Sequence, residues 1–89
     1  MKQGDRMDKI LVKLYVPVIE KTYDVLIPAH RRIYNVIQLL MKAVNELNDG
    51  CYTPSKMPLL YDRVTAEAYD VRLSVKEANI KNGTDIILV

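Results

Sequence analysis

The sequence predicts an α+β domain in which a mixed sheet of four to five strands packs on one helix. Three segments carry this prediction: an alternating segment at residues 9–16, a segment with helical spacing at residues 33–47, and a β-branched apolar segment at residues 84–89. A chain of 89 residues has room for one domain. Its hydrophobic content of 49 % is sufficient for a compact core.

The first strand is predicted from strict alternation. Its apolar residues on one face are Ile10, Val12, Leu14 and Val16. A period of two is typical of a half-buried strand. Pro17 ends this strand, residues 18–21 serve as a hairpin loop, and a second strand follows over residues 22–27 until Pro28.

The helix is predicted from apolar residues three and four positions apart. They are Ile33, Val36, Ile37, Leu40, Val44 and Leu47. The sequence Asn48-Asp49-Gly50 supplies a left-handed stop after the helix. Residues 29–31 offer no strong N-cap.

The remaining chain alternates between loops and short extended pieces. Residues 51–58 form a loop, residues 59–61 a brief strand, and residues 69–71 a candidate edge strand. Residues 75–80 are expected to form one turn that places Val75 and Ile80 on the core. The last strand is expected to lie centrally and parallel to the first, with the helix in a right-handed crossover.

Residues 1–8 are polar and are predicted to form a tail before a domain at residues 9–89. They lack the apolar stretch of a signal peptide, and no run of about eighteen apolar residues predicts a membrane span. The single cysteine, Cys51, excludes an intrachain disulfide and fits a reducing cytoplasm. We therefore expect a cytoplasmic protein without direct membrane insertion.

No residue pattern indicates catalysis, a metal or a cofactor. His30 has no nucleophile or ligand at a suitable spacing, so it reads as an exposed loop residue. Cys51 follows the predicted helix C-terminus, where the helix dipole disfavours a thiolate. Only three glycines are present, and none forms a phosphate loop. We expect a protein that is not an enzyme.

Nucleic-acid binding is not indicated either. The formal net charge is only +2, and the one basic cluster is His30-Arg31-Arg32, with Lys9 and Lys13 nearby in sequence. Nucleic-acid binders carry a stronger basic stripe. A solvated turn is the better interpretation of this cluster.

The positive functional signal is an apolar set on the sheet face that should meet water. If Ile10, Val12 and Leu14 face the helix, then the residues between them face away. The expected outward set, with lysine at its rim, is Leu11, Lys13, Tyr15, Leu26, Leu60, Ile87 and Val89. A sheet face that is exposed to water should carry polar side chains, so this apolar set indicates a protein-binding patch. A covering loop or self-association would explain the same pattern.

The predicted order of hairpin, helix, short strand and last strand is that of ubiquitin, the β-grasp fold. Residues 25–37 (VLIPAHRRIYNVI) and 77–89 (EANIKNGTDIILV) resemble the YukD/EsaB family. These are small ubiquitin-like proteins of the type VII (WXG100) secretion systems of Gram-positive bacteria. The loop at residues 49–58 is longer than the ubiquitin equivalent.

The resemblance implies a non-conjugating ubiquitin-like adaptor that docks its sheet face on a protein partner, such as a membrane-anchored secretion ATPase. The sequence has no C-terminal Gly-Gly, which ubiquitin and the sulfur carriers need for their chemistry, and YukD-type proteins also lack it. Two alternatives stay open: a β-grasp carrier or accessory protein of an enzyme system, and a ubiquitin-like domain that forms a homodimer through the same patch.

Overall fold

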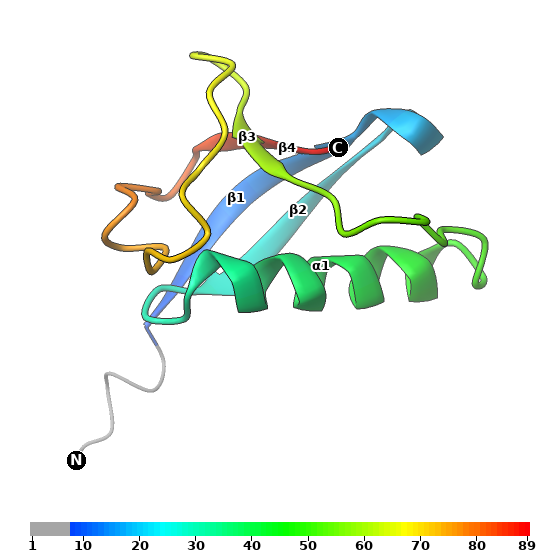
Figure 1. Cartoon of the computed structure of the whole chain (residues 1–89), viewed down its shortest axis with the longest axis horizontal. Coiled ribbons are helices and arrows are strands. Elements are labelled where there is room, and N and C mark those ends of the chain that lie inside the picture. Colours follow the sequence, from blue (N-terminus) through cyan, green and yellow to red (C-terminus); the bar gives the residue numbers. More distant parts are fainter. Residues whose placement is uncertain (1–7) are drawn as a thin grey trace.

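The computed structural model describes residues 8–89 and has the predicted α+β architecture (Figure 1). Its elements are β1 (Lys9–Val16), the short 3₁₀ helix η2 (Pro17–Ile19), β2 (Lys21–Pro28), α1 (Ile33–Leu47), β3 (Leu60–Asp62) and β4 (Asp85–Leu88). The four strands form one sheet in the order β2-β1-β4-β3, and α1 packs across one of its faces. Of the predicted tail at residues 1–8, all but Asp8 lies outside the described residues.

The sheet is mixed because its two central strands come from opposite ends of the described chain. β1 pairs with β2 in antiparallel register over all eight residues, and it pairs with β4 in parallel from Lys13 and Asp85 onward. β3 adds to the outer side of β4 in antiparallel register. The predicted central position of the last strand and its parallel pairing with the first are confirmed.

The helix begins without a side-chain cap, as expected from a sequence that has no strong N-cap residue at this point. Arg32 at the N-cap makes no side-chain cap hydrogen bond. Instead, the N–H groups of Ile33 and Tyr34 donate to the carbonyl oxygens of Leu73 and Val71, at 2.8 and 3.1 Å. The first-turn donors are therefore satisfied by a distant segment of the chain, which ties residues 71–73 to the start of α1.

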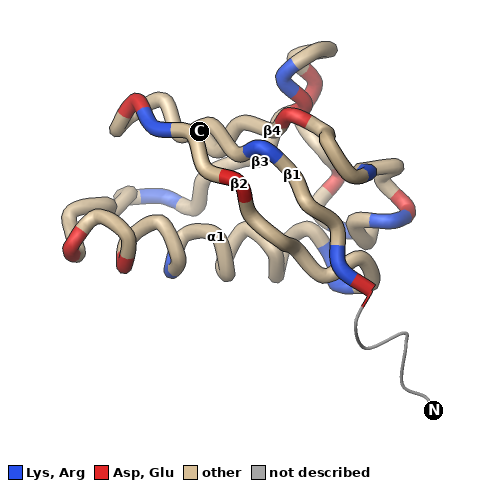
Figure 2. Tube along the Cα trace, turned by 180° about the vertical axis from the view of Figure 1, so that it is seen from behind, with Lys and Arg blue, Asp and Glu red and all other residues tan. Residues whose placement is uncertain are grey.

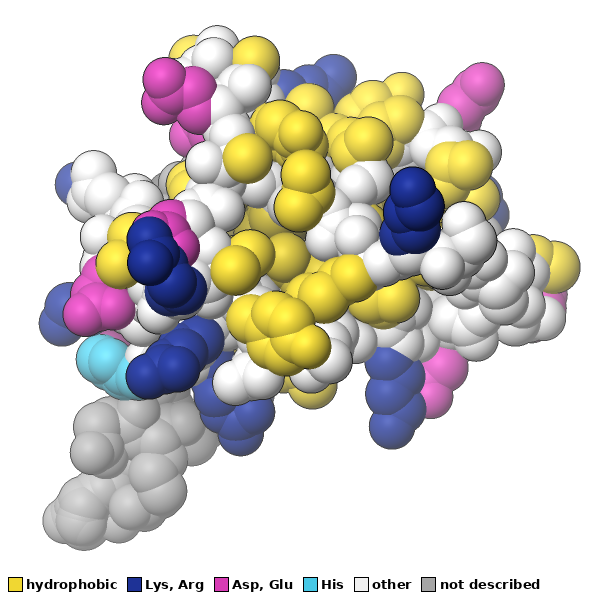
Figure 3. Space-filling model, viewed as in Figure 1, with side chains coloured by type: hydrophobic (Ala, Val, Ile, Leu, Met, Phe, Trp, Pro, Cys, Tyr) yellow, Lys and Arg dark blue, Asp and Glu magenta, His cyan; other side chains and the backbone are white. Residues whose placement is uncertain are grey.

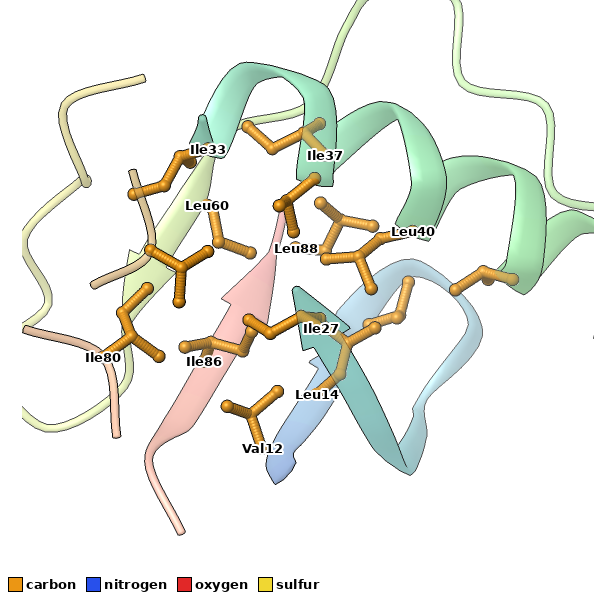
Figure 4. Close-up of a cluster of buried hydrophobic side chains, with 14 of the residues drawn as sticks. Val12, Leu14, Ile27, Ile33, Ile37, Leu40, Leu60, Ile80, Ile86 and Leu88 are labelled. Carbon is orange, nitrogen blue, oxygen red and sulfur yellow. The ribbon is translucent and has the colours of Figure 1, made fainter. Parts of the chain in front are cut away.

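The core lies between the inner face of the sheet and α1 (Figure 4). It contains the inward residues of β1, five buried residues of α1, and Ile86 and Leu88 of β4. Val75 and Ile80 are buried in the same cluster, as predicted, and the turn between them has Asn79 at a positive φ of 64°. Among the described residues, no buried side chain is polar or charged. Specificity of this fold therefore comes from apolar packing and backbone pairing.

The two edges of the sheet differ. The edge formed by β3 is short and is partly covered, because Tyr61 bridges to Ala68 and the N–H of Tyr69 donates to the carbonyl oxygen of Leu60 at 2.9 Å. The edge formed by β2 is eight residues long, and within residues 8–89 it pairs only with β1. In this part of the chain, a return segment closes one side of the sheet, and no segment pairs with the other.

Two details of the sequence prediction need correction. Leu60 was expected on the outer sheet face, but it is 1 % exposed and belongs to the core. Its register opposite Leu88 places both side chains on the helix side. The candidate edge strand at residues 69–71 is absent from the described sheet, since Ala68 contributes only an isolated bridge. The sheet therefore has four strands, which agrees with the predicted four to five.

Within residues 8–89, no helix is both long and apolar enough to cross a membrane.

Candidate functional site

The outer face of the sheet, opposite α1, is the surface that the sequence indicated. Six of the seven predicted residues, all except Leu60, have exposed or half-exposed side chains. Seen from behind, charged residues occur along the strands as well as at their ends (Figure 2). The six residues lie outward as expected, but they do not form a single patch.

A row of charges divides this face into two parts. Lys13 on β1 lies opposite Asp24 on β2 and opposite Asp85 on β4. Opposite charges in neighbouring strands stabilise a sheet by roughly 0.2–1 kcal/mol per pair. The row therefore forms a polar boundary across the middle of the face, with Lys13 at its centre rather than at its rim.

The smaller part is the pair of Leu11 and Leu26, which are direct cross-strand neighbours. Both side chains are well exposed. On the other side of Leu11 the chain turns at Gly83, whose N–H donates to the Leu11 carbonyl oxygen at 2.8 Å.

The larger part is a row of Tyr15, Ile87 and Tyr61 from three adjacent strands. The guanidinium carbon of Arg63 lies 4.7 Å from the centroid of the Tyr15 ring, close enough for a cation–π contact. Leu59 and Val89 extend the row, since their backbones exchange two hydrogen bonds of 2.8 and 3.0 Å. We call these five residues and Arg63 the Tyr15 row.

Sequence analysis missed Leu59, Tyr61 and Arg63 because it placed Leu60 outward. Side chains of a strand alternate, so an error of one residue exchanges the two faces. The sequence offers one polar residue here, Asp62, two positions after Leu60 and therefore on the same face of the strand. In a strand of only three residues, this single residue does not show which face is buried. A strand this short carries too few residues to show its period.

A groove continues from the Tyr15 row past the end of β4. Its volume is about 670 Å³, and it lies between η2 and the loop at residues 51–59. Val18, Met57 and Val89 contribute exposed apolar side chains, and Lys56 is the one charged residue of its lining. The groove is thus a predominantly apolar surface beside the outer face.

A third apolar area covers the opposite side of the molecule. Figure 3 shows hydrophobic side chains gathered between α1 and β3, with Lys and Arg side chains around them. Tyr34 on α1 belongs to this side, because it lines a hollow together with Met41 and the loop at residues 54–57. Exposed apolar area on this protein is therefore not confined to the outer sheet face.

Two titratable side chains with shifted pKa values, Asp62 and Tyr69, lie at the turn after β3. The Asp62 carboxylate accepts hydrogen bonds from the N–H of Val64 and Thr65, at 2.8 and 3.0 Å, and from the Tyr69 hydroxyl at 3.0 Å. These bonds, led by that from Thr65, hold the pKa of Asp62 below its usual value. Burial and the neighbouring carboxylate raise the pKa of Tyr69. The hydrogen bonds to Asp62 stabilise the turn that follows β3.

Two ion pairs lie on the surface. Asp70 binds the Arg72 side chain at 2.9 Å, and this hydrogen bonding lowers the pKa of Asp70 to about 2. Nε2 of His30 lies 2.7 Å from Oδ2 of Asp8. Cys51 is a free, exposed thiol. No group of three potential metal ligands occurs in the part of the chain that the structure describes.

The sheet order, the parallel pairing of β1 with β4 and the single crossing helix define a ubiquitin-like β-grasp domain. Solved structures bear out this fold. The ubiquitin-like domain of EccD5 from Mycobacterium xenopi is similar with a TM-score of 0.74 and 22 % sequence identity, covering 91 % of this chain and 92 % of that one.

Two further solved structures are also similar to this chain. The ubiquitin-like domain of the Mycobacterium tuberculosis type VII secretion protein EccD1 has a TM-score of 0.73 and 13 % identity, covering 91 % of this chain and 97 % of that one. A chain of the MycP5-free ESX-5 inner membrane complex has a TM-score of 0.74 and 17 % identity over 92 % of this chain and 21 % of that one. No protein-family model and no curated protein matches the sequence.

Proposed function

We propose that this protein is a non-conjugating, ubiquitin-like docking module of a type VII secretion system, similar to the YukD/EsaB proteins, that acts on the cytoplasmic side. It binds a protein partner of the secretion apparatus, such as the membrane-anchored secretion ATPase, through the outer face of its sheet. The Tyr15 row is the centre of the contact, and the pair of Leu11 and Leu26 is its second, smaller part.

The observation that carries this proposal is the unpartnered apolar outer face. An antiparallel sheet face open to water is ordinarily polar, whereas here Tyr15, Ile87 and Tyr61 stand side by side across three strands. Tyrosine and arginine are enriched at the energetic centres of protein interfaces. Support for the secretion system comes from fold likeness to the ubiquitin-like domains of EccD1 and EccD5.

The test is a quantitative pull-down of the cytoplasmic part of the secretion ATPase from the same organism. Ile87→Asp and Leu11→Asp each place a charge on the outer face without touching the core. We expect Ile87→Asp to reduce binding at least tenfold and Leu11→Asp to reduce it less, because Leu11 belongs to the smaller part. The matched control is Leu39→Asp, which places the same charge on an exposed apolar residue of α1, away from the outer face of the sheet.

Circular dichroism and thermal unfolding of each variant separate loss of binding from loss of fold. Binding that persists in folded Ile87→Asp contradicts the proposed surface. Light scattering on the free protein provides a second check. A stable dimer that Ile87→Asp dissociates would indicate that the face binds a second copy of the chain rather than another protein.

A further inference from the structure

A second interaction surface lies on the side of the molecule that α1 covers. One flank of α1 and the loop at residues 54–57 border a shallow hollow of about 550 Å³. We propose that this hollow binds an acidic amphipathic helix of another protein, whose apolar side chains enter it while its carboxylates pair with two lysines of the lining. The surface is separate from the outer face of the sheet, so it does not depend on the docking proposed above.

The α1 wall of the hollow is formed by residues on one side of the helix. Tyr34, Gln38 and Met41 are three or four positions apart, and Asn45 continues the same line. At about 1.5 Å per residue, the helix rises about 16 Å between Tyr34 and Asn45. This wall is therefore long enough to contact three turns of a second helix.

The opposite wall is the loop, which is held at both of its ends. Before the loop, the Asn45 side chain donates to the Tyr52 carbonyl oxygen at 2.6 Å. After it, Leu59 and Val89 exchange their two backbone hydrogen bonds. The side chains of Tyr52 and Pro58 are buried at these two ends. The hollow is thus formed before a partner binds, which reduces the conformational entropy lost on binding.

The apolar part of the lining is suited to receive side chains of a partner. Both methionines of the described residues, Met41 and Met57, line the hollow together with Tyr34. Tyr34 is 46 % and Met57 37 % exposed, whereas Met41 is half-buried against the core. Methionine adapts to irregular surfaces because its side chain is unbranched and polarisable. Tyrosine is enriched at the energetic centres of interfaces.

The charge of the lining selects an acidic partner. Lys42 on α1 and Lys56 on the loop both line the hollow, and no acidic residue does. Glu46, the one acidic residue of α1, is not part of the lining. Within residues 8–89, neither lysine forms an ion pair, so a carboxylate can approach them without breaking an existing pair. A second copy would bring the same two lysines, which disfavours a symmetric dimer here.

The walls favour a helical partner over an extended one. The backbone groups in the middle of α1 bond to one another, so this wall offers nothing for a strand to pair with. In the loop, Pro54 has no N–H. A bound segment must therefore satisfy its own backbone groups, which an α-helix does. Helices that bind in this way use apolar side chains at spacings of three, four and seven.

Three blocked eighteen-residue peptides are the probes. In the first, leucines at helical spacing form one face, and glutamate and glutamine form the rest. The second has lysine in place of glutamate, and the third has the composition of the first with its leucines spread around the helix. Binding is measured by NMR titration of the whole protein, observed at the methionine methyl groups and the backbone amides.

We expect saturable binding of the first peptide and at least fivefold weaker binding of the other two. The methyl groups of Met41 and Met57 and the amide of Lys56 should shift most. The amide of Ile87, on the outer face of the sheet, should shift less. Absence of saturable binding by the first peptide, or largest shifts on the outer face, overturns the proposal.

Met57→Asp tests the apolar contact. It places a charge of the same sign as the first peptide in the hollow, so we expect a loss of at least tenfold. The matched control is Val64→Asp, at a residue that is 84 % exposed in the turn after β3 and outside the lining. The control should bind as the unmodified protein does, and circular dichroism shows whether each variant is folded. Equal losses in the two folded variants overturn the proposal.

Reversing both lysines tests the charge of the hollow. With Lys42→Glu and Lys56→Glu together, the first peptide should bind at least fivefold more weakly and the second at least fivefold more tightly. A damaged fold would weaken both peptides, so the gain for the second peptide reports charge alone. The matched control is Lys76→Glu with Lys81→Glu, which changes the net charge equally at two exposed residues outside the lining. An unchanged preference in the first double variant, or the same reversal in the control, overturns the proposal.

Two further results would assign the surface to another occupant, and each overturns the proposal. A concentration-dependent shift of the Met57 methyl group without peptide would identify a second copy of the chain. Sedimentation with phosphatidylglycerol vesicles that requires Lys42 and Lys56, without saturable peptide binding, would identify an anionic lipid surface. Ile87→Asp should bind the first peptide normally, so failure of this proposal and failure of the docking face can be told apart.

Discussion

The guanidinium carbon of Arg63 lies 4.7 Å from the centre of the Tyr15 ring, and this contact joins the residue that follows β3 to the central strand β1. The same arginine donates its backbone N–H to the Asp85 carbonyl oxygen at 3.0 Å. The backbone hydrogen bond fixes the position of Arg63 beside β4, and from there its side chain reaches across the outer face to Tyr15. Both residues lie on the outer face of the sheet.

Replacing Arg63 with alanine removes this contact while leaving its backbone bond. An exposed cation–π pair contributes about 0.5–1 kcal/mol, so we expect the free energy of unfolding to fall by no more than that amount. Urea denaturation measures it, and Arg63→Lys should recover part of the loss. If Arg63→Ala loses as much in a protein that already carries Tyr15→Leu, the two residues are not coupled.

The position of Leu60 is tested by comparing it with its neighbour in sequence. Truncating a buried leucine costs about 2–5 kcal/mol because it removes apolar contacts and leaves a cavity. We expect Leu60→Ala to destabilise the protein by this amount in urea denaturation. Leu59→Ala, at a residue that is 48 % exposed, should cost well under half as much. Equal costs would contradict the inward placement of Leu60.

Ser74 and Glu77 form a reciprocal pair at the turn that carries Val75 and Ile80. The Ser74 N–H donates to Oε1 of Glu77 at 2.9 Å, and the Glu77 N–H donates to Oγ of Ser74 at 3.0 Å. This is the geometry of a capping box, whose loss costs about 1 kcal/mol. We expect Ser74→Ala to lower the thermal midpoint by several degrees. Ser55→Ala, in an exposed loop, is the control and should leave it unchanged.

The acid stability of the protein should depend on Asp62. Its pKa is lower in the folded state, chiefly because the Thr65 N–H bonds to the carboxylate. The unfolded chain therefore takes up the proton first as the pH falls, at an ordinary aspartate pKa of about 3.9. The stabilisation is complete above that pH and is lost as the pH falls through the lower folded pKa.

Asp62→Asn should accordingly be less stable than the unmodified protein at pH 7 and closer to it at pH 2.5. Urea midpoints at the two pH values measure the difference. An equal difference at both values would mean that the ionised form of Asp62 makes no special contribution. The amide oxygen of asparagine can still accept from the N–H of Val64 and Thr65, so the turn should persist in the variant.

The sequence predicted the long elements because each repeats its pattern several times. β1 repeats its alternation of inward and outward residues four times over eight residues, and α1 keeps apolar residues on one face over fifteen residues. β3 has three residues, which is too few to show which side faces the core, and Leu60 was placed on the wrong side for this reason. Its position is decided by its register with β4, a contact between distant parts of the chain.

Two features of the surfaces could also not be predicted from sequence patterns. The division of the outer face by Lys13 requires the registers of three strands at once. The open edge at β2 follows from strand order, since Ala68 and Tyr69 cover β3 while nothing in the described chain pairs with the far side of β2. Alternation along one strand reports which side chains are buried, and it carries no information about which strand lies at the edge.

The pairing of β1 with β4 has a consequence for how the protein folds. Lys13 and Asp85 are register partners although they are 85 − 13 = 72 positions apart in sequence. During synthesis, the hairpin of β1 and β2 is complete long before β4 emerges from the ribosome, so the middle strand of the finished sheet spends that time as an exposed edge. Contacts between distant residues slow folding, and unpaired strand edges promote aggregation of folding intermediates. The nascent chain is therefore most vulnerable after α1 has been made and before the last strand is released.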